Sequence, residues 1–95
     1  MLVADDDPDH RALVAELLEP LGFVVRQASD GAGALRMASD MVGDGRPDLF
    51  LLDIAMPGMT GWELARRLRE DASQTAPIAV VLPAPTWPTN TSLFW

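Results

Sequence analysis

Residues 49–61, LFLLDIAMPGMTG, decide the fold class of this chain. The first four residues form a continuous apolar run, which is typical of a strand buried on both faces of a parallel sheet. Asp53 follows directly, and a proline and a glycine then turn the chain. Thr60 and Glu63 have the spacing of a capping box, which indicates the start of a helix. The stretch therefore predicts a buried strand, a turn that opens with a carboxylate, and a helix.

The rest of the chain up to residue 82 repeats this alternation of apolar runs and helical patterns. Apolar runs predict strands at 2–4, 23–25, 49–52 and 78–82. The helices are expected from apolar side chains three and four residues apart: Leu13, Val14, Leu17, Leu18 and Leu21; then Leu35, Ala38, Met41 and Val42; then Leu64, Ala65 and Leu68. The order β-α-β-α-β-α-β predicts an α/β fold, a doubly wound parallel sheet with helices on both faces.

Composition and charge exclude several kinds of protein. The 95 residues carry 7 basic and 14 acidic side chains, a net charge of −7, and all seven basic residues are arginine. Such a balance argues against a nucleic-acid or anionic-membrane surface and favours a divalent cation as ligand. With no cysteine and one histidine, disulfides and thiolate metal sites are excluded. No apolar run resembles a signal peptide or a membrane span, so a cytoplasmic location is expected.

Carboxylates follow two of the predicted strands. Asp5 and Asp6 come directly after the first strand, and Asp53 comes after the third. If these strands are parallel neighbours, the three carboxylates converge at one edge of the sheet and repel each other unless a cation lies between them. A site with only oxygen ligands suits Mg²⁺ or Mn²⁺. The alternative role, as helix cap or turn former, is the one we expect for Asp7 and Asp48.

The two acidic motifs together resemble the receiver domains of response regulators. The opening LVADDDP at 2–8 is similar to the family's acidic pair, and DIAMPGMTG at 53–61 is similar to its phosphoacceptor loop. The resemblance implies a flavodoxin-like fold in which Asp53 accepts a phosphoryl group from a phosphohistidine of a sensor histidine kinase or a histidine phosphotransfer domain. It also implies that Mg²⁺ is held by Asp6 and Asp53, by Asp5 directly or through water, and by the backbone carbonyl of Ala55.

The sequence departs from the family pattern towards its end. A full receiver domain has five strands and five helices, so we expect an incomplete receiver domain at 1–82 and an irregular tail, rich in Pro, Thr and Trp, at 83–95. The family's hydroxyl at the end of strand four is replaced by Leu82-Pro83-Ala84, and its lysine after strand five has no counterpart. We therefore expect an impaired switch, and self-association through the uncovered sheet edge at 78–82.

Two other functions stay open beside the leading hypothesis, a signalling phosphoacceptor that is not an enzyme. One is an interaction module that is never phosphorylated. The other is a phosphohydrolase with an aspartyl-phosphate intermediate, although Ala55 stands where such enzymes carry a second aspartate. Elsewhere we expect His10 to face solvent, Trp62 to be partly buried, and the arginines of the third helix to form a solvated face: Arg66, Arg67 and Arg69.

Overall fold

The computed structural model describes residues 1–41 and 46–81, which form four strands and three α-helices. In chain order these are β1 (Leu2–Ala4), α1 (Pro8–Leu18), a 3₁₀ turn η1 (Glu19–Leu21), β2 (Arg26–Ala28), α2 (Gly31–Asp40), β3 (Phe50–Asp53), α3 (Gly61–Glu70) and β4 (Ile78–Val81). The alternation predicted from the sequence is confirmed. The predicted tail at 83–95, together with Val42 and Leu82, lies outside the described residues.

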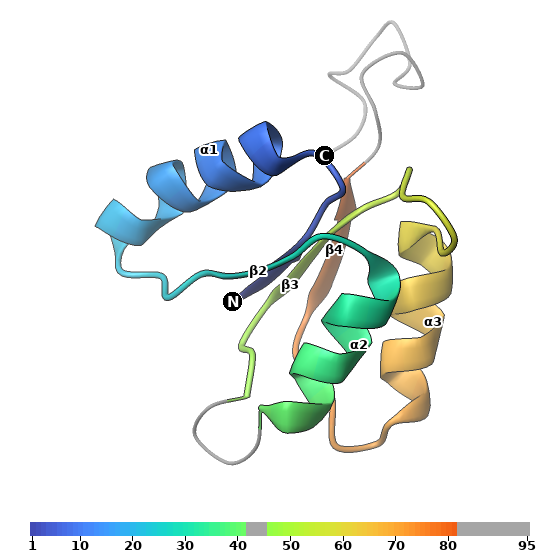
Figure 1. Ribbon diagram of the computed structural model, residues 1–95. Helices are drawn as coiled ribbons and strands as arrows, with labels where there is room; N and C mark the ends of the chain where they lie inside the picture. Colours follow the sequence, from blue (N-terminus) through green and yellow to red (C-terminus); the bar gives the residue numbers. More distant parts are fainter. Residues whose placement is uncertain (42–45, 82–95) are drawn as a thin grey trace, which may run out of the picture.

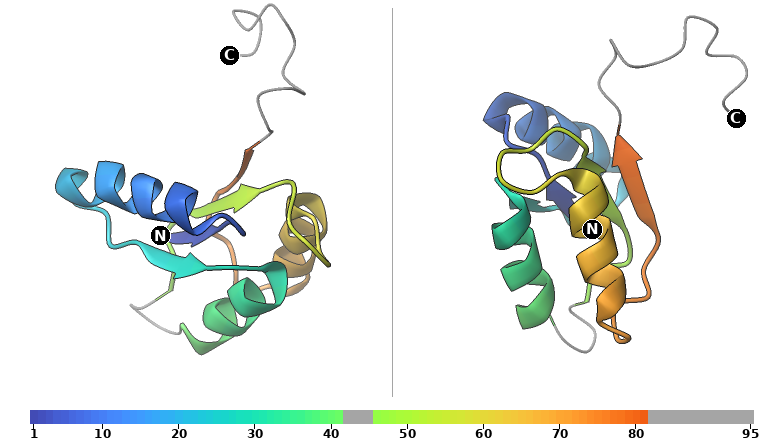
Figure 2. Two further views of the ribbon diagram at one scale, coloured as in Figure 1. Left: turned by 45° about the horizontal axis from the view of Figure 1, so that its top comes forward. Right: turned by 90° about the vertical axis from the view of Figure 1, so that its right-hand side faces the viewer.

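The four strands form one parallel sheet in the order β2-β1-β3-β4 (Figure 1). Leu2 pairs with Arg26 on one side and with Phe50 on the other, and Phe50 pairs with Ile78. Helix α1 lies on one face of the sheet and helices α2 and α3 lie on the other (Figure 2). The strand order reverses between β1 and β3, which is the point where α/β sheets of this kind bind their ligands.

The core lies between the sheet and the pair α2 and α3. Its largest fully buried side chains come from β1, β3 and α3: Leu2, Phe50, Leu52, Leu64 and Leu68. Helix α2 presents the small side chains of Ala34 and Ala38 to this core, so it lies close to the sheet. Polar anchoring is added by Gln74, which is buried and donates from Nε2 to the carbonyl of Ala38 at 2.8 Å.

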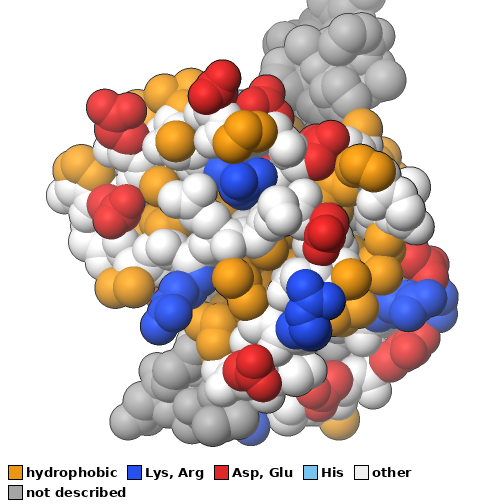
Figure 3. Space-filling model, in the orientation of Figure 1, with side chains coloured by type: hydrophobic (Ala, Val, Ile, Leu, Met, Phe, Trp, Pro, Cys, Tyr) orange, Lys and Arg blue, Asp and Glu red, His pale blue; other side chains and the backbone are white. Residues whose placement is uncertain are grey.

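The apolar stripe of α1 is largely exposed, although a stripe of this kind ordinarily faces a core. Leu17 is 62% exposed and Leu21, in the following turn η1, is 73% exposed, while Ala15 is the only buried residue of α1. No second helix lies beside α1 in the described part of the chain, so much of this stripe has nothing to pack against. Figure 3 shows hydrophobic side chains among acidic ones over this region.

The second strand is three residues later than predicted. The apolar run Phe23–Val25 leads into the sheet, but pairing occupies Arg26–Ala28. Strand β1 is only three residues long and its register begins with Leu2 opposite Arg26, so the residues before Arg26 have little of β1 to pair with. Val24 is exposed for the same reason. Apolar character alone did not locate the strand.

Strand β3 and helix α3 also differ in detail from expectation. Strand β3 begins at Phe50 and includes Asp53, and Leu51 is half-buried because one face of the sheet is less covered than the other. The prediction for Trp62 is wrong, since its side chain points outward from the first turn of α3 and is 58% exposed. None of the helices in 1–41 and 46–81 has the length and hydrophobicity that a membrane span requires.

Candidate functional site

Three carboxylates meet at the carboxyl ends of β1 and β3. Asp5 follows the last residue of β1, and Asp53 is the last residue of β3, its parallel neighbour. One oxygen from each of Asp5, Asp6 and Asp53 lies within 4.8 Å of the others. The predicted convergence is therefore confirmed, because adjacent parallel strands end at the same edge of the sheet.

The three carboxylates differ in burial and therefore in the cost of their charge. Asp5 is buried, with 4% exposure, whereas Asp6 is exposed and Asp53 is half-buried. Loss of hydration raises the pKa of the Asp53 carboxyl above its ordinary value. The Ala55 N–H donates to Asp53 Oδ1 at 3.3 Å and opposes this increase in pKa, while the charges of Asp5 and Asp6 add to it. An ionised cluster of this kind is stabilised by a cation.

Asp5 is held in place by groups from the start of α1. Its Oδ1 accepts the N–H of Asp7 at 3.0 Å, its Oδ2 accepts from His10 Nδ1, and its backbone carbonyl accepts from Arg11 Nη1 at 2.7 Å. The hydrogen bond between His10 and the Asp5 carboxylate raises the pKa of His10. Asp7 caps the helix, as predicted. The prediction that His10 faces solvent is confirmed, since its side chain is 49% exposed, but its contact with Asp5 was not expected.

The loop after Asp53 depends on two glycines. Gly58 has φ of +80°, in the left-handed region that glycine adopts without strain. At Gly61 an added Cβ would lie 2.5 Å from the Asp53 carbonyl oxygen and 2.9 Å from the Ile54 Cα, both backbone atoms. The Gly61 N–H donates to the carbonyl of Ile54 at 3.0 Å. The start of α3 therefore packs directly against the backbone of the acidic residue.

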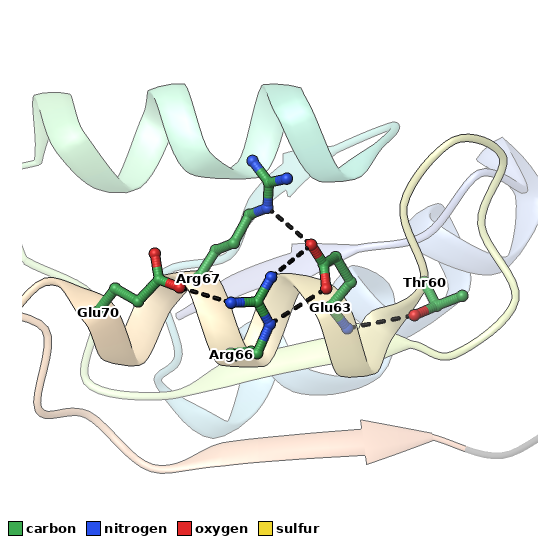
Figure 4. Close-up of polar contacts among 5 residues, drawn as sticks. All are labelled: Thr60, Glu63, Arg66, Arg67 and Glu70. Carbon is green, nitrogen blue, oxygen red and sulfur yellow. Dashed lines mark hydrogen bonds and ion pairs between the residues drawn. The ribbon is translucent and has the colours of Figure 1, made fainter.

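Helix α3 begins with half of the predicted capping box (Figure 4). Thr60 Oγ1 accepts the Glu63 N–H at 3.2 Å, but the Glu63 carboxylate binds Arg66 and Arg67 instead of returning to the cap. Arg66 also pairs with Glu70 at 2.6 Å, so these charges are largely satisfied on the helix surface. Arg69 instead donates to backbone carbonyls of the loop before β4. The expectation of a solvated face holds for Arg66 and Arg67.

Comparison with known proteins gives the family. Residues 1–84 match the response regulator receiver domain family. The sensor protein EvgS of Escherichia coli is 42% identical over 73 residues, which are 77% of this chain and 6% of EvgS.

Two solved structures have the same fold. The Vibrio cholerae chemotaxis protein CheY4 superposes with a TM-score of 0.76 and 32% identity, covering 83% of this chain and 63% of CheY4. The response regulator TrrA of Thermotoga maritima, in complex with Mg²⁺-BeF, superposes with a TM-score of 0.70 and 34% identity, covering 85% of this chain and 64% of TrrA.

The match spans most of this chain but less than two thirds of each of these relatives. With these neighbours the parallel α/β sheet is identified as a flavodoxin-like fold. The chain belongs to the response regulator receiver domain family, a signalling family of two-component systems whose members work with sensor histidine kinases.

Proposed function

We propose that this chain accepts a phosphoryl group on Asp53 from a phosphohistidine of a sensor histidine kinase or histidine phosphotransfer domain. The observation that carries the proposal is the position of Asp53 at the strand-order reversal, half-buried and within 4.8 Å of two further carboxylates. A carboxylate is a competent covalent acceptor, and at this edge a partner can reach it from solvent.

The donor set at the site fits Mg²⁺. Three carboxylates supply only oxygen, and the pKa of Asp53 is raised first by loss of hydration and then by the neighbouring charges of Asp5 and Asp6, both of which a bound cation would offset. We assign Asp6 and Asp53 as direct ligands, Asp5 as a direct or water-mediated ligand, and the backbone carbonyl of Ala55 as a further ligand. When bound, Mg²⁺ neutralises charge on the oxygens of the transferring phosphoryl group. The complex of TrrA with Mg²⁺-BeF supports the assignment.

The protein groups define the transfer step. Asp53 Oδ1 accepts the Ala55 N–H, which leaves Oδ2 as the oxygen that attacks phosphorus. The new O–P bond forms in line with the P–N bond of the donor, which breaks, and its electron pair returns to the donor imidazole. Residue 55 is alanine, so the described site has no acid at the position where a phosphohydrolase of this type carries one.

Phosphorylation is expected to bias the conformation of this chain only weakly. The sequence contains no lysine, and the family's phosphate-binding lysine therefore has no counterpart within these 95 residues. A covalent group shifts an equilibrium only by the difference in its contacts with the two states. With fewer contacts to the phosphoryl group, that difference is small.

The test is incubation with Mg²⁺ and a small phosphodonor, with intact mass as the measurement. We expect one added phosphoryl group that is stable in acid and labile in base, and none in Asp53→Asn. Asp48→Asn is the matched control, because this exposed carboxylate at the opposite end of β3 should be irrelevant to labelling. Labelling that persists in Asp53→Asn contradicts the assignment, and a folded but unlabelled chain favours the interaction module instead.

A further inference from the structure

A closed ring of hydrogen bonds connects Asp5 to the first turn of α1. The N–H of Asp7 donates to Asp5 Oδ1, and Asp7 Oδ1 in turn accepts the N–H of His10 at 3.4 Å. The ring closes where His10 Nδ1 meets Asp5 Oδ2. Both oxygens of the buried Asp5 carboxylate thus accept hydrogen bonds from residues at the start of α1. Asp6, the next residue, has no such restraint in the described part of the chain.

We propose that His10 is a positioning residue for the metal centre, holding the Asp5 carboxylate in the orientation that Mg²⁺ binding requires. The inference rests on the proposed function, because it assumes that Asp5, Asp6 and Asp53 hold the ion. Groups that hydrogen-bond to a metal-binding carboxylate fix its direction and thereby raise the affinity of the site.

The geometry supports a positioning role over a merely structural one. A carboxylate oxygen only accepts, so His10 Nδ1 is the donor, and it donates in this contact whether the ring is neutral or charged. The imidazole is half exposed and contributes little to the core, so its removal should leave the fold intact. The backbone N–H of His10 is already bound by the Asp7 cap, so the imidazole ring is available to hydrogen-bond to Asp5.

The ring nitrogen involved gives a sharp test. In His10→Asn the side-chain amide nitrogen occupies nearly the place of Nδ1, whereas in His10→Gln it extends to the place of Nε2 and misses the contact. His10→Ala removes the donor altogether. We expect Mg²⁺ affinity to fall about 10-fold in His10→Ala and in His10→Gln, and to stay within about 3-fold of wild type in His10→Asn.

The experiment is a titration of the full chain with Mg²⁺ alone, at one pH, followed by calorimetry or by amide NMR shifts of the residues after Asp53. Far-UV circular dichroism of each variant shows that the fold is retained. Asp6→Ala identifies the site, because it should remove the response completely.

Three results contradict the inference, and they point to different faults. Normal Mg²⁺ binding in wild type with equal or tighter binding in His10→Ala shows that His10 does not position Asp5, and leaves the proposed function in place. A wild-type chain that does not respond to Mg²⁺ overturns both. Loss in His10→Asn as large as in His10→Ala also contradicts the role assigned to Nδ1.

Discussion

Removing the charge of Asp53 should stabilise the metal-free chain. At 4.8 Å, the upper limit for the site's carboxylate oxygens, two unit charges repel by about 3.5 kcal/mol at an effective dielectric constant of about 20 and by about 0.9 kcal/mol in water. Asp6 is exposed, so its repulsion with Asp53 should lie near the lower value, and the exposed part of Asp53 also allows solvent to screen its repulsion with the buried Asp5. Asp53→Asn relieves two such pairs, and its Oδ1 can still accept the Ala55 N–H. We expect the free energy of unfolding to rise by about 1–2 kcal/mol at neutral pH.

The pH dependence follows from the direction of the pKa shift. The fold raises the pKa of Asp53 above 3.8, so the folded state holds the proton more tightly than the unfolded chain does. The destabilising contribution of its charge is absent below pH 3.8 and appears as the pH rises through the pKa of the folded state. The gain in the free energy of unfolding that Asp53→Asn brings over wild type should therefore be largest at neutral pH and disappear in acid.

The assay is thermal unfolding in low salt, with and without Mg²⁺. For a domain of this size each kcal/mol changes the midpoint by about 4–8 °C. Mg²⁺ should stabilise wild type by binding the folded state and should stabilise Asp53→Asn much less. Glu16→Gln, on an exposed turn of α1, removes one charge away from the site and should change the midpoint little. A lower midpoint for Asp53→Asn without metal, or equal stabilisation of both proteins by Mg²⁺, would refute the reasoning.

Four further predictions concern the metal, the loop, the switch and the sheet edge. Asp6→Ala should abolish the Mg²⁺-dependent rise in the unfolding midpoint while its far-UV spectrum stays that of wild type; an unchanged rise contradicts the ligand role. Gly61→Ala forces a Cβ against the Asp53 backbone and should cost about 1–3 kcal/mol of stability, measured by urea unfolding, so a neutral effect would count against close packing there. Hydrogen exchange with and without a phosphoryl mimic should change little on α3 and β4, and strong local protection would contradict a weak switch. The apolar strand β4 pairs only with β3 in the described part of the chain, so light scattering should detect self-association, and a monomer with a sharp melt argues against it.

The features that depend on local sequence signals could be predicted from the sequence, and those that depend on pairing between distant segments could not. Asp7 and Pro8 mark the start of α1 because capping and φ restriction act locally, within the residues themselves. The position of β2 depends on how much of β1 is available to pair, which no local property of Phe23–Val25 contains. The exposure of Trp62 likewise depends on which face of α3 meets the sheet.

The candidate site likewise has one part that could be predicted from the sequence and one part that could not. That Asp5, Asp6 and Asp53 meet follows from topology alone, because two strands of one parallel sheet end at a common edge whatever their side chains are. The contact between His10 and Asp5 depends instead on where the first turn of α1 places the imidazole relative to the end of β1, and the Asp7 cap holds the backbone of that turn. An aspartate pair in a sequence thus predicts where charge gathers, but the groups that orient each carboxylate are found only once the first helical turn is placed.

Unequal orientation gives the three carboxylates different tasks. Asp5 is buried and held by Asp7, His10 and Arg11, so in the proposed metal site it would act as a fixed negative charge against which a cation is placed. Asp6 is exposed, so its side chain could adjust to the proposed ion. Asp53 is half-buried, and one of its oxygens accepts the Ala55 N–H, while the other would be the nucleophile of the proposed phosphoryl transfer. If all three were equally mobile, the cluster would relieve its repulsion by turning outward, and the charge that attracts a cation would be lost. A rigid Asp5 prevents this, which is why a residue with no place in the transfer step itself, His10, should still determine how well the site binds its ion.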